Sequence, residues 1–217
     1  MSISNFINNI IEKRRKKIRN NYPGEIGKFF RAGGNELLFN SIDIDDNSIV
    51  IDGGAYDGEF ICKILERFGC KIIAYEPNKF FFEKLNLRFK KNKRIFIHNN
   101  AIWSSNSILD MSNDDLNSSI YAKSRGNKVN GIDVIDIMNK YQKIDLMKLN
   151  VEGAEYEILN RLINEGQINN IKNFLIQFHK INEDSQQARD NIREIFINKG
   201  YKEIFNYTFV WELWSKE

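Results

Sequence analysis

Short apolar runs alternate with stretches of helical spacing along most of the chain. Apolar runs bounded by turn residues predict buried strands, at 48–52, 71–75, 94–98, 144–149 and 171–178. Apolar residues three and four positions apart predict helices, at 59–68, 78–90, 133–141, 154–165 and 186–199. Two aromatic-rich strands with almost no loop between them, 201–206 and 208–214, predict a terminal hairpin. The pattern therefore predicts a doubly wound α/β fold, with a mainly parallel seven-stranded sheet and a C-terminal antiparallel hairpin.

Two segments depart from this alternation. Residues 3–20 have helical spacing and residues 21–35 contain a proline and four glycines, so we expect an N-terminal helix and a leading loop within 1–40. Residues 104–128 are rich in Ser, Asn and Asp, which predicts a long loop with small elements. We expect this loop to be a lid or substrate-shaping insertion in a single domain that spans 41–217.

The charge of the chain is nearly balanced, with 32 basic and 29 acidic residues and a net charge of +3. This balance does not by itself indicate a polyanion-binding protein. The basic run at 13–17 would attract phosphate or anionic lipid, but a solvated helix face is the more common interpretation. We expect no nucleic-acid partner, no transmembrane segment and, by default, a cytoplasmic location.

Only two cysteines occur, Cys62 and Cys70. They are too few for a disulfide scaffold, a four-cysteine zinc site or a three-cysteine iron–sulfur motif. We expect both to be reduced thiols of the core.

A glycine-rich turn follows the first predicted strand. Its residues are Asp52, Gly53, Gly54, Ala55, Tyr56, Asp57 and Gly58. Doubly wound folds bind ligands beyond the carboxyl ends of the central strands, so this turn is the candidate cofactor-binding segment. Its spacing also resembles a dinucleotide-binding turn. Asp52, directly before the glycines, and Asp57 favour a cationic cofactor over a pyrophosphate, which requires bare amides.

Further candidate ligand-binding residues end the second and third predicted strands. Glu76 ends the second strand, where a carboxylate accepts hydrogen bonds from both ribose hydroxyls of an adenosine-containing cofactor. Pro77 stops that strand and starts a helix. Asn100 follows the third strand and is placed to hydrogen-bond an adenine, with Ala101 or Ile102 covering its face. A plain loop is the alternative for this third segment.

Three motifs in the right order carry a resemblance to a known family. They are Asp52-Gly53-Gly54-Ala55-x-x-Gly58, Glu76-Pro77-Asn78 and Lys148-Leu149-Asn150-Val151-Glu152-Gly153-Ala154-Glu155. Over about residues 48–180 the chain resembles the FkbM-type methyltransferases, which are class I enzymes with a Rossmann-like fold. The resemblance implies S-adenosylmethionine as the cofactor and O-methylation, often of a sugar. Asn150 stands where the family pattern usually has aspartate, so the hydrogen-bonding geometry is kept but the charge is lost.

Candidate catalytic residues follow the fourth and fifth predicted strands. Lys148, Asn150 and Glu152 alternate in an extended segment and would share one face if strand geometry persists. Glu152 is a candidate base or acceptor-orienting group, and Lys148 would neutralise the acceptor or stabilise developing oxyanion charge. His179 ends the fifth strand and is a candidate base. A hard-cation site formed by Asn150, Glu152, His179 and Asp184 is an alternative, but no spacing demands it, so we expect no metal.

Two other functions stay open from sequence. A catalytically silent S-adenosylmethionine-binding module would have the same fold. An NAD-dependent oxidoreductase is less favoured, because the Tyr75-x-x-x-Lys79 spacing falls after the second strand, where a catalytic pair would not meet nicotinamide. Together with the polar 104–128 segment, the resemblance favours a small-molecule carbohydrate acceptor, such as a glycan precursor or a nucleotide- or phosphate-linked sugar. The sequence does not predict the oligomeric state.

Overall fold

The computed structural model describes residues 22–111 and 127–217. Its helices are α2 (Gly24–Arg31), α3 (Asn35–Asn40), α4 (Glu59–Phe68), α5 (Lys79–Phe89), α6 (Val134–Tyr141), α7 (Glu155–Asn164) and α8 (Ser185–Asn198), with a 3₁₀ helix η1 (Gln167–Asn170). Its strands are β1 (Ile49–Gly53), β2 (Lys71–Tyr75), β3 (Ile95–His98), β4 (Ala101–Trp103), β5 (Ser107–Met111), β6 (Asn127–Asp133), β7 (Ile144–Leu149), β8 (Ile171–Ile176), β9 (Lys202–Tyr207) and β10 (Trp211–Ser215). The predicted helix at 3–20, with its basic run, and residues 112–126 of the insertion lie outside the described residues.

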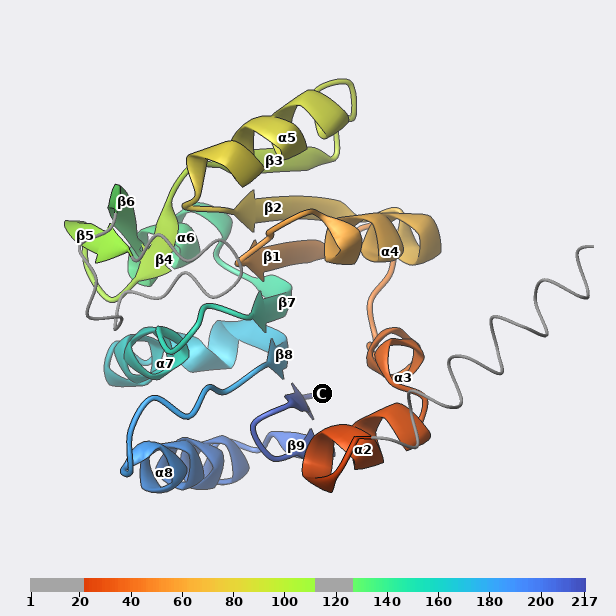
Figure 1. The fold of residues 1–217 in the computed structure, drawn as a ribbon, viewed down its shortest axis with the longest axis vertical. Coiled ribbons are helices and arrows are strands. Elements are labelled where there is room, and N and C mark those ends of the chain that lie inside the picture. The colour runs from red at the N-terminus through yellow and green to blue at the C-terminus, as the bar shows by residue number, and fades with distance from the viewer. Residues whose placement is uncertain (1–21, 112–126) are drawn as a thin grey trace, which may run out of the picture.

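Seven strands form one sheet in the order β3-β2-β1-β7-β8-β10-β9 (Figure 1). The first five strands of this order pair in parallel, and β10 pairs antiparallel with both β8 and β9. The strand order reverses between β1 and β7, which is where doubly wound sheets bind ligands. The predicted α/β fold with a C-terminal antiparallel hairpin is confirmed.

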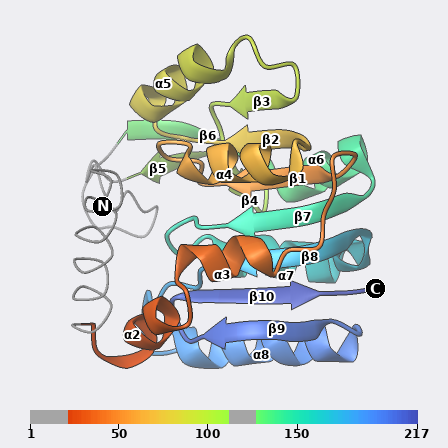
Figure 2. The ribbon, with the colours of Figure 1, turned by 90° about the vertical axis from the view of Figure 1, so that its right-hand side faces the viewer.

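Helices cover both faces of the sheet (Figures 1 and 2). One face packs against α6, α7 and α8, and the other packs against α2, α3, α4 and α5. Successive strand residues point to opposite faces, so Val50 belongs to one core and Ile51 to the other, and both are fully buried. Burial on both faces is the reason that the central strands are continuous apolar runs rather than alternating ones.

The expected leading loop over 21–35 is instead largely helical. Helix α2 buries Phe29, whose ring contacts Tyr207 of β9 edge-on, with 5.5 Å between the ring centroids. The glycines and the proline of this segment indicated a loop, but they are compatible with an amphipathic helix. Pro23 precedes the first turn of α2, where proline is tolerated. The division of the chain at residue 40 stays a prediction.

The small elements expected in the 104–128 insertion include a strand. Strand β5 pairs antiparallel with β6, which pairs in parallel with β4, and these three strands form a separate small sheet. Met111 is buried on it, whereas Ile108 is largely exposed. No helix within 22–111 or 127–217 is long and apolar enough to cross a membrane.

Candidate active site

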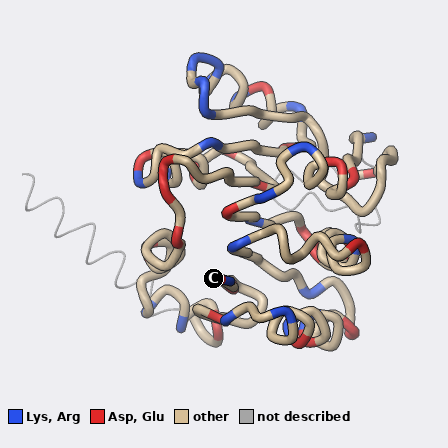
Figure 3. The backbone as a smooth tube through the Cα atoms, turned by 180° about the vertical axis from the view of Figure 1, so that it is seen from behind, with Lys and Arg blue, Asp and Glu red and all other residues tan. Residues whose placement is uncertain are grey.

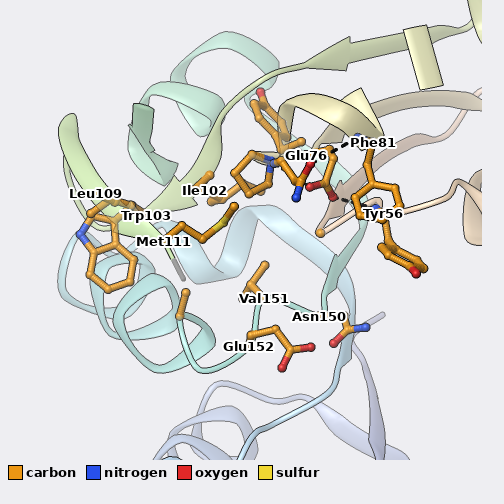
Figure 4. A pocket seen from close by; sticks show the side chains of 16 residues that line it. Tyr56, Glu76, Phe81, Ile102, Trp103, Leu109, Met111, Asn150, Val151 and Glu152 are labelled. Carbon is orange, nitrogen blue, oxygen red and sulfur yellow. Dashed lines mark hydrogen bonds between the residues drawn. The ribbon is translucent and has the colours of Figure 1, made fainter. Parts of the chain in front are cut away.

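A cavity of about 260 Å³ lies where β1, β2 and β7 end (Figure 4). Gly54, Glu76 and Asn150 directly follow these three strands, and all of them line the cavity. Strands β4 and β5 of the small sheet contribute another wall, with Trp103, Leu109 and Met111. The remaining lining residues are Tyr56, Tyr75, Pro77, Asn78, Phe81, Ala101, Ile102, Val151, Glu152 and Ala154.

The glycine turn after β1 is pressed against the segment that follows β7. The backbone N–H of Asn150 donates to the Gly53 carbonyl at 3.1 Å. Gly54 has a φ of +77°, and a Cβ there would lie 2.0 Å from the Asn150 carbonyl oxygen. Neither the backbone conformation nor the space admits a side chain at this position. Tyr56 then turns its ring onto Phe81, with 4.3 Å between the ring centroids.

Glu76, in the cavity wall, joins the glycine turn to the segment that follows β2. Its Oε2 accepts from the Tyr56 N–H at 2.7 Å, and its Oε1 accepts from the Asn78 N–H at 2.8 Å. Each carboxylate oxygen has a second lone pair, so the group retains capacity for two more donors, such as a pair of ribose hydroxyls. Burial raises the pKa of Glu76 above its ordinary value, against the hydrogen bonds from Asn78 and Tyr56. Asn99 fixes the following backbone by donating to the Glu76 and Pro77 carbonyls.

Lys148 and Asp52 form a buried ion pair, which differs from the roles expected from sequence. The two residues are register partners on β7 and β1, and Lys148 Nζ lies 2.8 Å from Asp52 Oδ1. The same ammonium donates to the carbonyls of Gly53 and Gly54, at 3.2 and 2.7 Å. Lys148 is 4% exposed and Asp52 is fully buried. The pair therefore holds the glycine turn, and the charge of Asp52 is already balanced by a cation of the protein itself.

A second charged cluster lies at the ends of β7 and β8. His179 Nε2 lies 3.4 Å from Glu152 Oε2, and its Nδ1 lies 3.0 Å from Glu155 Oε1. Glu155 is fully buried and also accepts from the backbone N–H groups of His179 and Gly153. Glu152 lines the cavity and has a φ of +52°, a conformation that non-glycine residues seldom adopt. The Glu-Gly-Ala-Glu motif thus places one glutamate in the cavity wall and uses the other to hold the histidine.

The charge of His179 follows from these contacts. Burial alone would lower the pKa of His179, but the hydrogen bonds and charges of Glu152 and Glu155 outweigh it and raise the pKa to about 9. The imidazole is therefore a cation at neutral pH. A ring that holds both protons accepts no further one, so these contacts favour a charge-balancing role for His179 over the predicted base.

The cavity brings together about half of the predicted site residues. Seven of them line it: Gly54, Tyr56, Glu76, Pro77, Ala101, Asn150 and Glu152. Among the described residues, eight others lie outside its wall: Asp52, Gly53, Ala55, Asp57, Gly58, Asn100, Lys148 and His179. Asn100 turns its amide to the Asn130 carbonyl at 3.4 Å, toward β6 of the small sheet.

Several lining residues carry no sequence signal for a site. Trp103, Leu109 and Met111 reach the cavity only because the small sheet folds over the edge of the large one. Glu155 is different, because its place in the Glu-Gly-Ala-Glu motif already marked it, although no role was assigned to it. The available signal was that Glu155 is a carboxylate in the first turn of a helix, three residues after Glu152.

The wall has hydrogen-bonding capacity that fits an adenosine-containing cofactor. Within the described part of the chain, the buried Asn150 Oδ1 has no hydrogen-bond partner. Asn150 lines the same cavity as Glu76, and Glu76 has two acceptor positions to spare. Unpaired acceptors in a largely apolar cavity are costly unless a ligand supplies donors, as ribose hydroxyls and an amino group do. Residues 22–111 and 127–217 contain no group of three or more His, Cys, Asp or Glu side chains arranged to hold a metal.

The sheet order, the glycine turn and the cavity define a class I methyltransferase fold with S-adenosylmethionine as its cofactor. The chain belongs to the FkbM methyltransferase family: the family model for the methyltransferase FkbM domain matches residues 52–203. No curated protein matches the chain.

Solved structures show the same fold at low sequence identity. One is a Streptococcus mutans protein described as a methyltransferase, in complex with SAH (S-adenosylhomocysteine). It is 12% identical to this chain, the match covers 84% of this chain and 97% of that chain, and the TM-score is 0.53. The Geobacter metallireducens precorrin-6y C5,15-methyltransferase is 10% identical, with 85% and 88% covered and a TM-score of 0.50.

One expectation about partners is corrected by the comparisons. Matched structures also include a Streptococcus pneumoniae protein described as a tRNA methyltransferase, 11% identical over 84% of this chain and 69% of that chain, with a TM-score of 0.47. Other matches are described as an rRNA methylase and an rRNA methyltransferase. The expectation of no nucleic-acid partner was therefore wrong: matched structures are described as methyltransferases of tRNA and rRNA.

Proposed function

We propose that the chain transfers the methyl group of S-adenosylmethionine to a sugar hydroxyl, with Glu152 as the proton acceptor. The observation that supports this proposal is the Glu152 carboxylate in the cavity wall, paired with the cationic His179 at 3.4 Å. Methyl transfer to a hydroxyl needs an acceptor oxygen aligned with the methyl group and a group that takes up the hydroxyl proton. Glu152 supplies that second requirement beside Asn150, at the β7 side of the cavity.

His179 and Glu155 act through Glu152 in this proposal. His179 is a positioning cation, since its ring nitrogens lie against one carboxylate on each side. Glu155 fixes the tilt of the imidazole and the Gly153 backbone together. A carboxylate held in this way needs little reorganisation when it accepts a proton, which is the benefit of a preorganised site.

The cofactor would be held by groups on three strand ends. Glu76 would accept from the ribose hydroxyls, Asn150 Oδ1 would accept from an amino group, and Gly54 would admit the ligand close to the backbone. The apolar wall that includes Phe81 and Ile102 would cover the adenine. When bound, S-adenosylmethionine supplies a methyl group that is activated by its cationic sulfur.

The acceptor class follows from the family resemblance, which favours sugar hydroxyls. A hydroxyl of a free or nucleotide-linked sugar and a ribose hydroxyl within RNA offer the same group to Glu152. The proposal therefore names the sugar hydroxyl, and the assay separates its sources. A cytoplasmic location remains part of the proposal.

The test uses S-adenosylmethionine with an isotope-labelled methyl group and three acceptor pools: nucleotide-linked sugars, short oligosaccharides and RNA. We expect label on an oxygen of one pool, located by mass spectrometry. Glu152→Gln should slow transfer by roughly 10²-fold or more, which is the usual contribution of a general base. Label on nitrogen or carbon would overturn the proposal.

Two controls accompany this assay. Glu157→Gln changes an exposed glutamate of α7, five residues after Glu152, and should leave the rate unchanged. SAH affinity of Glu152→Gln should stay within about threefold of the native value, because the lost interaction belongs to the transfer step. A Glu152→Gln variant that keeps the native rate would remove Glu152 from the mechanism.

A further inference from the structure

Positive charge gathers on one part of the surface, although the whole chain carries a net charge of only +3. The segment 79–94 has seven basic residues and a single acidic one, Glu83. The seven are Lys79, Lys84, Arg88, Lys90, Lys91, Lys93 and Arg94, and all are exposed. We call them the basic face. Figure 3 shows the loop between α5 and β3 as an almost continuous basic stretch at the top of the view.

The basic face has a regular geometry along α5. Phe80, Lys84 and Arg88 follow one another at four-residue spacing, so they form one stripe along the helix. Lys84 Nζ lies 4.3 Å from the centroid of the Phe80 ring, and that ring is 59% exposed. At the far end of the helix, an open groove is lined by Arg88, Lys91, Lys93 and Arg94, together with Asp46, Leu65, Gly69, Phe89 and Asn92.

The stripe starts beside the cofactor cavity. The Phe80 ring contacts Phe81, with 5.3 Å between the centroids, and Phe81 lines the cavity. Arg88 also donates to the Asp57 carbonyl of the glycine turn at 3.3 Å. Helix α5 has 11 residues and is therefore about 16 Å long. A chain-like anion lying along it would run from the groove to the mouth of the cavity.

We propose that the basic face binds single-stranded RNA, with the cations on the phosphates and the Phe80 ring under an unpaired base. Exposed cations that run along α5 and the loop after it match a repeating anion better than a single phosphate does. An exposed aromatic ring within this line is the second element that single-strand binding uses, because every base has a face that stacks. The partner is additional to the proposed reaction, and its binding is measured without methyl transfer.

The test is fluorescence anisotropy with a labelled single-stranded RNA of roughly 12 nucleotides, within the usual site size. Lys91→Glu/Lys93→Glu should raise the dissociation constant at least about tenfold and flatten the salt dependence by roughly 0.7 per lost phosphate contact. The matched control, Lys143→Glu/Lys199→Glu, makes the same charge change at exposed lysines outside the basic face and should bind like the native chain. Equal losses in both variants would overturn the proposal.

Phe80→Ala and inorganic polyphosphate distinguish RNA from a general anion. We expect Phe80→Ala to weaken RNA binding roughly tenfold, the value of one stacked base, and to leave polyphosphate binding unchanged. RNA binding that is insensitive to Phe80→Ala would overturn the RNA assignment. SAH affinity and thermal unfolding of each variant verify that the fold and the cofactor cavity are intact.

Discussion

At the scale of single residues, His179 connects the cavity wall to a buried carboxylate. One of its ring nitrogens lies against Glu152 in the cavity wall, and the other lies against the fully buried Glu155. A buried carboxylate without a partner is costly, and a charged histidine offsets that cost for two carboxylates at once. The stability of this region therefore depends on the proton that His179 holds.

This dependence predicts a loss of stability at alkaline pH. The folded chain holds the His179 proton up to a pKa of about 9, whereas an ordinary histidine releases it near 6.5. The native state thus binds more protons between these values, so this contribution is complete below about pH 6.5 and disappears as the pH rises through 9. Its size is up to roughly 3 kcal/mol. Urea unfolding should show a steeper decline over this range for the native chain than for His179→Gln, and parallel declines would contradict this assignment.

Residue-level roles were the part of the site that sequence predicted least well. The alternation of Lys148, Asn150 and Glu152 was visible, but not that β1 lies beside β7 with Asp52 opposite Lys148. Strand register is set by long-range pairing, which no local pattern contains. As a result, a lysine expected at the acceptor is instead the cation that holds the glycine turn.

At the scale of elements, the glycine turn and the segment after β7 depend on each other. The Gly54 backbone lies so close to the Asn150 carbonyl that no Cβ fits between them. The turn therefore sets the position of Asn150 and, through the chain, of Glu152.

Gly54→Ala should destabilise the fold and disrupt the cavity together. Gly69→Ala is the matched control, since Gly69 also has a positive φ, of +64°, but an added Cβ would meet nothing within 4 Å. The control should cost roughly 1 kcal/mol of unfolding free energy from backbone strain alone, and Gly54→Ala clearly more because of the clash. Thermal and urea unfolding compare the two variants. Equal destabilisation would mean that the turn relaxes away from Asn150.

Elements of the large sheet were predictable because each is a continuous apolar run with a helical segment beside it. The small sheet was not predictable, because β5 and β6 lie in or next to a polar segment. Strands β4 and β5 both pair with β6, in a sheet that is separate from the large one. Helix α2 was missed for a related reason: its glycines indicated a loop, and only the burial of Phe29 against the sheet explains the helix.

At the scale of the whole molecule, three features lie around one sheet edge. The cofactor cavity occupies the ends of β1, β2 and β7, the Glu152–His179–Glu155 cluster closes its β7 side, and the basic face begins at its α5 side. The central claim about this cavity is that Glu76 binds the ribose of the cofactor.

Calorimetric titration of SAH into the native chain and into Glu76→Gln tests that claim most directly. The glutamine amide would place a donor against the Tyr56 or Asn78 N–H, and one acceptor for a ribose hydroxyl would be lost. We expect the native chain to bind SAH, and the variant to bind it roughly 10- to 100-fold more weakly, the value of hydrogen bonds to a charged group. Glu83→Gln, an exposed change on α5, should bind like the native chain. Equal affinity of Glu76→Gln and the native chain, or binding of NAD in place of SAH, would contradict the account.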